Sequence, residues 1–321
     1  MIMKRHNLIL AGILVVQIIL GVVVFWPNSA TTAEREPLFP DLEGDDIVAL
    51  TVTDAEGNDL ALRKVSGEWV LPEADDYPAQ ADKVATLLDK IAGLTTGRLV
   101  ARTDTSHRRL QVASDDFVRR VEVETEDGTG QTLYLGSSPG YGALHFRVEG
   151  QSETYLTNEL SLQETQATAA SWVDTAYLSV AQADLTRVRL ENANGTFTFV
   201  RDDEGNWTMV GLGADETLAE TKVTATIRQA ASVRLSHPLG KEELPAYGMD
   251  EPNAVVTLET EDETITLRVG AQDPDDNSYV VKSSESPYYV RVSQMSADNL
   301  VNNTREDFLE LPATPTPETA P

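Results

Sequence analysis

Two short segments carry residue types that could do chemistry, and the first resembles a nucleophile site. Residues 136–140 read Gly-Ser-Ser-Pro-Gly, which matches the Gly-x-Ser-x-Gly pattern of serine hydrolases. In those enzymes the serine stands at a strand-to-helix turn, and the N–H of the next residue helps to bind the oxyanion. Here the next residue is Pro139, which has no N–H, and residues 143–148 have the pattern of a strand. We therefore interpret the segment as a hairpin turn.

The second segment resembles a calcium loop. Residues 273–277 read Asp-Pro-Asp-Asp-Asn and place side-chain oxygens at the first, third and fifth loop positions. The sixth position is Ser278 instead of glycine, and the twelfth is Ser284 instead of glutamate. We interpret this segment as a solvated, acidic hairpin turn. The four histidines have no metal-ligand spacing. The sequence therefore predicts a protein without a metal site, a cofactor or enzymatic activity.

Four aromatic residues are candidate contacts to a partner or a glycan: Trp69, Trp207, Tyr141 and Tyr288. Exposed aromatic rings stack on sugars and anchor protein interfaces. However, Trp69 and Trp207 stand at equivalent positions of an internal repeat, each at the close of a predicted second strand. That equivalence favours a core role, in which both rings face a helix.

The composition narrows the class of protein. The 321 residues include 25 Lys and Arg against 52 Asp and Glu, which gives a net charge of −27. Nucleic-acid binders need a basic surface to displace phosphate counterions, so no nucleic-acid partner is expected. The chain has no cysteine, which excludes disulfides, thiolate nucleophiles, iron–sulfur clusters and a lipid-modified cysteine. Hydrophobic residues make up 41%, enough for a packed core.

The N-terminal segment, residues 1–33, predicts a membrane anchor. Residues 8–26 contain no charged side chain, and such a helix would be about 28 Å long, close to one hydrocarbon core. Lys4 and Arg5 precede this stretch, and all the acidic residues follow it. The pattern predicts a single-pass protein of the cytoplasmic membrane, with its N-terminus inside and the other domains outside. A cleaved signal peptide is the alternative, although its apolar stretch is usually shorter.

An internal repeat organises the rest of the chain. Asp46 and Asp184 open similar strand patterns, and Gly67 and Gly205 precede the two tryptophans; both pairs are 138 residues apart. A repeat of this length indicates two homologous domains. After the N-terminal segment, the sequence predicts a first repeat at 34–157, a helical connector at 158–183, a second repeat at 184–305 and a disordered Pro/Thr-rich tail at 306–321.

Each repeat is predicted to have an α+β fold, an antiparallel β-meander with one packed helix. Val48, Leu50 and Val52 alternate with the smaller Ala49 and Thr51, which is typical of a half-buried strand. Val84, Leu87, Leu88 and Ile91 have the spacing of one helix face. The second repeat has a thinner apolar stripe, within residues 217–235. Further strands are expected at the following ranges: 118–125, 132–135, 144–148 and 154–156, then 255–260, 264–269, 279–282 and 288–292.

Four segments resemble a bacterial family, the "domain of unknown function 4340" proteins. They are Gly-Glu-Trp-Val-Leu-Pro at 67–72, the helix start at 77–84, Trp-Val-Asp-Thr-Ala-Tyr-Leu at 172–178 and Tyr-Gly-Met-Asp-Glu-Pro at 247–252. Residues 112–117 depart from the equivalent of the last motif. The resemblance carries no catalytic residues. It implies an association with ABC-type exporters or with auxiliary components of gliding-motility transporters.

These features predict a function without catalysis. We expect a membrane-anchored, extracytoplasmic accessory protein of an envelope or ABC-transporter-type assembly. It would act through protein–protein contacts of its two repeated domains, with a membrane protein such as a transporter permease as partner. The alternative is a module that binds a cell-wall glycan or another envelope polymer, and a hydrolase is a third, weaker hypothesis.

Overall fold

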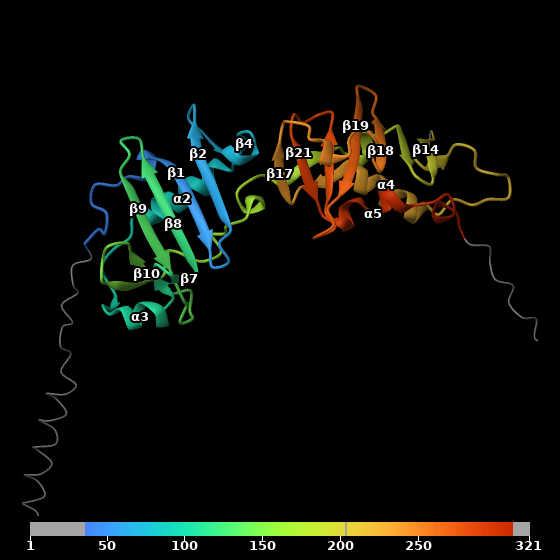
Figure 1. The fold of residues 1–321 in the computed structure, drawn as a ribbon. Coiled ribbons are helices and arrows are strands. Elements are labelled where there is room, and N and C mark those ends of the chain that lie inside the picture. Colours follow the sequence, from blue (N-terminus) through green and yellow to red (C-terminus); the bar gives the residue numbers. More distant parts are fainter. Residues whose placement is uncertain (1–35, 203, 311–321) are drawn as a thin grey trace, which may run out of the picture.

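Two wide antiparallel sheets, placed edge to edge, make up most of the protein (Figure 1). The computed structural model describes residues 36–202 and 204–310. We call residues 36–157 the first unit, residues 158–183 the connector and residues 184–310 the second unit. Each unit contains one wide sheet, and the chain passes from one to the other once.

The first unit has a nine-stranded sheet in the order β4-β3-β2-β1-β8-β9-β10-β11-β5. Two short strands, β6 and β7, form a separate hairpin. The elements of the first unit are η1 (Gly44–Asp46), β1 (Ile47–Asp54), β2 (Asp59–Val65), β3 (Glu68–Leu71), η2 (Pro72–Ala74), β4 (Tyr77–Pro78), α2 (Ala81–Ala92), β5 (Leu99–Ala101), α3 (Asp104–Arg109), β6 (Val112–Ala113), β7 (Asp116–Phe117), β8 (Arg119–Thr125), β9 (Gly130–Leu135), β10 (Leu144–Val148) and β11 (Thr154–Thr157).

The second unit has an eight-stranded sheet in the order β15-β14-β13-β18-β19-β20-β21-β17. The connector contributes η3, β12 and η4, and β12 pairs with β16. These elements are η3 (Ala169–Ser171), β12 (Ala176–Ser179), η4 (Gln182–Asp184), β13 (Arg187–Asn192), β14 (Gly195–Arg201), β15 (Trp207–Met209), α4 (Glu220–Ala231), β16 (Ser232–Arg234), β17 (His237–Gly240), η5 (Pro245–Tyr247), β18 (Ala254–Glu259), β19 (Thr264–Gln272), β20 (Tyr279–Ser283), β21 (Tyr289–Val292), α5 (Gln294–Asn302) and η6 (Glu306–Phe308).

The two sheets share one strand order once β4 is set aside. β3-β2-β1-β8-β9-β10-β11-β5 in the first unit corresponds to β15-β14-β13-β18-β19-β20-β21-β17 in the second. Positions 138 residues apart occupy corresponding strands, as Trp69 in β3 and Trp207 in β15 illustrate. The register of β1 shows how the core forms: Leu50 lies opposite Leu62 on one side and Val123 on the other, and all three are buried.

The helices pack as their apolar spacing predicts. In α2 the predicted face of Val84, Leu87, Leu88 and Ile91 is buried, because these residues share one side of the helix. The second helix, α4, covers only residues 220–231 of the predicted 217–235. Its chain continues directly into β16, which pairs with β12 of the connector.

The predicted α+β fold is wrong, because the protein consists mostly of β-sheet. The sequence pattern located the strands, but it did not show that the strands after each helix pair with the strands before that helix. In the structure β8 pairs with β1, and β18 pairs with β13. Each unit therefore forms one wide sheet instead of separate meanders, and the helices α2 and α4 have 12 residues each.

The predicted transmembrane helix also requires correction. Within the residues that the structure describes, no helix is long and apolar enough to cross a membrane. The segment 8–26 that carried this prediction lies outside the described residues, as does most of the predicted tail. The structure therefore does not support the membrane anchor, the single-pass orientation, the location in the cytoplasmic membrane or the membrane-protein partner that were inferred from that segment.

Two further segments differ from expectation. Residues 306–310, the start of the predicted disordered tail, include η6 and bury Phe308 completely. Its ring centroid lies 5.2 Å from that of Phe197 and 5.0 Å from that of Phe199. The connector was expected to be helical, but it consists of turns, short 3-10 helices and β12. Its conformation follows from its contacts with both units.

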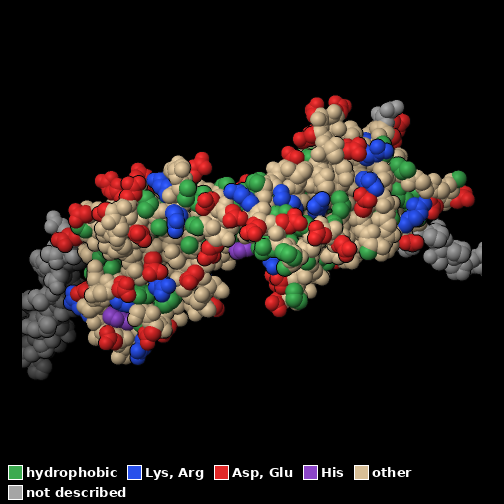
Figure 2. Space-filling model, turned by 45° about the horizontal axis from the view of Figure 1, so that its top comes forward, with side chains coloured by type: hydrophobic (Ala, Val, Ile, Leu, Met, Phe, Trp, Pro, Cys, Tyr) green, Lys and Arg blue, Asp and Glu red, His purple; other side chains and the backbone are tan. Residues whose placement is uncertain are grey.

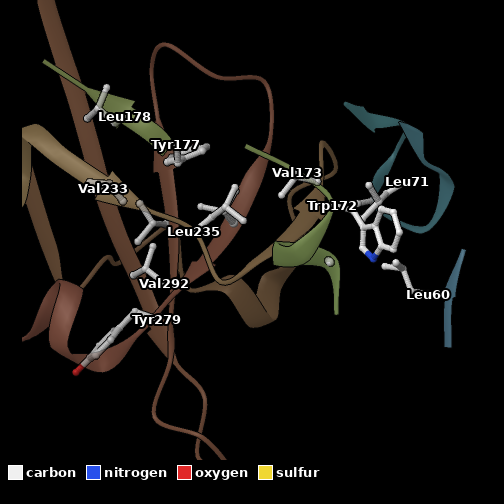
Figure 3. Close-up of a cluster of buried hydrophobic side chains, with 14 of the residues drawn as sticks. Leu60, Leu71, Trp172, Val173, Tyr177, Leu178, Val233, Leu235, Tyr279 and Val292 are labelled. Atoms are coloured by element: carbon white, nitrogen blue, oxygen red, sulfur yellow. The ribbon is translucent and has the colours of Figure 1, made fainter. Parts of the chain in front are cut away.

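The connector is fixed to the first unit by Trp172. Figure 3 shows its ring beside Leu60 and Leu71 of the first sheet, and no part of Trp172 is exposed to solvent. The indole Nε1–H donates to the carbonyl of Gln166 at 2.7 Å. The Trp172 carbonyl accepts the N–H of Gln80, at the start of α2, also at 2.7 Å. Burial of both polar groups is therefore compensated by hydrogen bonds.

Five residues further along, the connector is fixed to the second unit. The Tyr177 hydroxyl donates to the carbonyl of Tyr288 at 2.7 Å and accepts the N–H of Ser283 at 2.9 Å. Figure 3 shows Tyr177 and Leu178 on the side of the cluster where Val233 and Leu235 lie. The connector is thus held at both ends by buried side chains, with only a few residues between the two attachments.

Candidate functional site

The two sheets meet at a region that we call the junction. It comprises residues 72–80 of the first unit, 166–178 of the connector, and 236–241 and 286–291 of the second unit. Here the inner edge of the first sheet, with β3, η2 and β4, faces the edge strand β17 of the second sheet, and both labels β4 and β17 lie between the units in Figure 1.

A carboxylate of the first unit caps the backbone of the second. Asp75 and Asp76 have φ angles of 52° and 60°, in the left-handed region that Asp tolerates better than most residues. This turn directs the Asp75 carboxylate at the second unit, where Oδ2 accepts the N–H of Lys241 at 2.6 Å. The adjacent Gly240 has a φ of 101°, and a Cβ there would lie 2.6 Å from Asp75 Oδ2. The close approach therefore requires glycine at position 240.

Aromatic contacts extend the same interface. The rings of Tyr77 and Tyr288 have centroids 4.6 Å apart, tilted by 59°. The Tyr288 hydroxyl donates to the carbonyl of Asp76 at 3.0 Å, and Lys241 Nζ lies 4.8 Å from the Tyr288 ring centroid. Aromatic pairs of this kind contribute about 0.5–1.5 kcal/mol beyond their buried area. Tyr288 therefore contacts the first unit through both its ring and its hydroxyl.

The surroundings of Tyr77 keep its phenol neutral. Burial, together with smaller effects of the neighbouring Tyr177, Asp174 and Tyr288, raises the pKa of Tyr77 to about 12. All three neighbours belong to the connector or the second unit. The ionisation of Tyr77 is therefore sensitive to whether the units are in contact.

A groove of about 420 Å³ runs along the junction. Burial lowers the pKa of His237, as does the nearby Arg291, whereas Glu73 opposes the shift, so the imidazole is largely neutral at physiological pH. The Ser236 hydroxyl donates to the carbonyl of Arg291 at 3.1 Å. A neutral imidazole and short polar groups can bind a ligand through hydrogen bonds. All three parts of the chain line the groove: Asn58, Asp59, Leu60, Ala61, Leu71, Glu73 and Ala74, then Ala167, Thr168 and Ala169, then Ser236, His237 and Pro238.

The four predicted contact residues lie on different elements. Tyr288 belongs to the junction, whereas Trp69 in β3 is only 7% exposed. Trp207 in β15 is half-buried, with the guanidinium carbon of Arg201 5.0 Å from its ring centroid. Tyr141 is fully exposed at the turn between β9 and β10. No aromatic pair among the described residues joins two of these four, so the structure gives no support to a glycan platform built from them.

Both segments interpreted as turns connect neighbouring strands. The Ser138 hydroxyl donates to the carbonyl of Ala143 at 2.6 Å, inside the loop between β9 and β10. Asp273 Oδ1 accepts the N–H of Asp275 at 3.0 Å, and Asp273 Oδ2 pairs with Arg291 at 2.8 Å. Both hairpin predictions are confirmed. In residues 36–202 and 204–310, no group of three or more His, Asp or Glu residues is arranged to hold a metal ion.

Sequence reasoning missed most of the residues that build the junction. Asp75 and Gly240 are 165 positions apart, and only the folded chain reveals that they touch. Two signals were available: Tyr288 was a candidate contact residue, and Trp172 lies in a segment that resembles the family. A large aromatic residue in a polar connector indicates burial against a neighbouring domain.

The fold defines a mostly-β protein with two antiparallel sheets of common topology joined through a buried connector. Comparison with protein families places it more narrowly. The sequence model of "Domain of unknown function (DUF4340)" matches residues 69–236 and 214–311, which together span more than half of the chain. The chain belongs to the DUF4340 family, as its sequence resemblance indicated. Comparisons with curated proteins and with solved structures give no match.

A Gly240→Ala substitution should loosen the junction. The new Cβ would displace the Asp75 carboxylate, so the Lys241 amide should exchange with deuterium about tenfold faster. The matched control is Gly140→Ala, because Gly140 has a similar φ of 105° but no atom within 4 Å of the new Cβ. Equal Lys241 exchange in both variants would contradict the proposed contact.

Alkaline pH should lower the stability of the folded protein, because Tyr77 ionises. The folded pKa of about 12 exceeds the ordinary value of 10.0, so the contribution to stability is complete below pH 10.0 and is lost as pH rises toward about 12. Between about pH 9 and about pH 11, the melting temperature of the Tyr77→Phe variant should therefore fall less than that of the unsubstituted protein. Tyr141→Phe, at a fully exposed position, is the control, and its melting temperature should fall as much as that of the unsubstituted protein.

Proposed function

We propose that the protein is a non-enzymatic accessory component of an envelope or ABC-transporter-type assembly. It acts through protein–protein contacts made by its two sheet units. The association with ABC-type exporters comes from the family resemblance.

The observation that carries this proposal is the junction. Two units of common topology are held by a connector buried at both ends, by the Asp75–Lys241 hydrogen bond and by the contact between Tyr77 and Tyr288. Such an arrangement fixes two similar surfaces at one spacing, as a protein that positions or joins partners requires. A pair of units on a loose linker would not define that spacing.

The charge supports a partner with basic surfaces. Asp and Glu side chains are spread over both units on the face in Figure 2, and the net charge of the chain is −27. A field of one sign steers oppositely charged partners and increases their rate of association. The contacts should therefore weaken as salt screens these charges.

Affinity capture of the tagged full chain from its host tests this function. We expect subunits of an ABC-transporter-type assembly, or other envelope proteins, to copurify in a fixed ratio at low salt and to be depleted at high salt. The Gly240→Ala variant should recover less of the same partners than the Gly140→Ala control, because its junction is looser. Recovery of the chain alone at low salt would contradict the proposal.

A further inference from the structure

The two outer edges of the molecule are the counterparts of the two edges that meet at the junction. The first sheet ends in β5, which corresponds to β17, and the second sheet ends in β15, which corresponds to β3. Inside the chain, the segment after β3 faces β17. Among the described residues no sheet edge lies against the equivalent segment after β15, which contacts Arg305 instead, and none lies against β5.

The β5 edge is apolar and flanked by basic residues. Leu99 and Val100 are each 46% exposed, which makes them two of the most exposed large apolar side chains among the described residues. Arg98 and Arg102 stand on either side and are exposed, although Arg102 also pairs with Glu153 at 3.1 Å. Within residues 36–202 and 204–310 only β11 pairs with β5, so in this part of the chain the outer backbone groups of β5 have no strand partner.

The opposite end carries complementary features. Residues 210–216 follow β15 as η2 follows β3, since position 210 lies 138 residues after position 72. Val210 is 59% exposed, and Asp215 is also exposed. This loop is apolar and acidic, whereas the β5 edge is apolar and basic.

We propose that copies of this chain associate head to tail, with the loop 210–216 of one copy docked on the β5 edge of the next. The contact would repeat between molecules the arrangement that the junction already uses within one. Because the two surfaces differ, a bound pair retains one free edge of each kind, and further copies can add to it head to tail.

The intermolecular contact should be weaker than the junction. Gly213 stands at the position of Asp75, and Asp215 stands at the position of Tyr77. The carboxylate cap on Lys241 and the contact between Tyr77 and Tyr288 therefore have no direct counterpart. What remains is apolar contact and attraction between Asp215 and the two arginines, so association should depend on concentration and salt.

Cross-linking of single cysteines tests the proposal directly, because the chain has no cysteine of its own. The Leu99→Cys and Val210→Cys variants, mixed and treated with a short bismaleimide, should give about tenfold more heterodimer than a mixture of Tyr141→Cys and Val210→Cys. Tyr141 is more exposed than Leu99, so the control has the more accessible thiol. Circular dichroism of each variant verifies that it is folded.

The outcomes separate the alternatives. Enrichment of the Leu99–Val210 product, reduced by Arg98→Glu in the Leu99→Cys variant, supports the head-to-tail contact. A yield equal to the control overturns it. Predominant homodimers of the Leu99→Cys variant alone would also overturn it, because they indicate a two-fold contact between β5 edges.

Discussion

The burial of Trp172 against the first sheet is the constraint on which the arrangement of the two units depends. A connector without that contact would leave two similar sheets on a flexible tether. With the indole fixed beside Leu60 and Leu71, Tyr177 can reach the second unit only a few residues later. Loss of a buried tryptophan typically costs about 3–5 kcal/mol, which is large beside the single hydrogen bonds of the junction.

The two units have the same topology, but their edges are not equivalent. The inner edges carry the specific pair of Asp75 and Gly240 and the contact between the tilted rings of Tyr77 and Tyr288. The outer edges keep exposed apolar residues with opposite flanking charge. This difference gives the molecule a direction, from the β5 end to the β15 end. A protein with a direction and a fixed spacing suits a role in assembly better than two independent domains would.

Local features were predictable from the sequence, whereas long-range ones were not. The apolar spacing of Val84 to Ile91 predicted one buried helix face, and turn chemistry identified the loops at Ser138 and Asp273. The fold class was wrong because alternation reveals a strand but not its partner, and the β1–β8 pairing decides the architecture. The junction was not predictable either, since it depends on a left-handed turn at Asp75 meeting a glycine far along the chain.

The central claim is that the connector and the junction hold the two units as one body. The most direct measurement is the distance distribution between spin labels placed by Glu56→Cys and Glu261→Cys, at exposed hairpin tips of the first and second units. The labelled protein should give one narrow distance peak, and it should give a broad distribution when Trp172→Ala is added. A broad distribution with Trp172 in place would contradict the central claim.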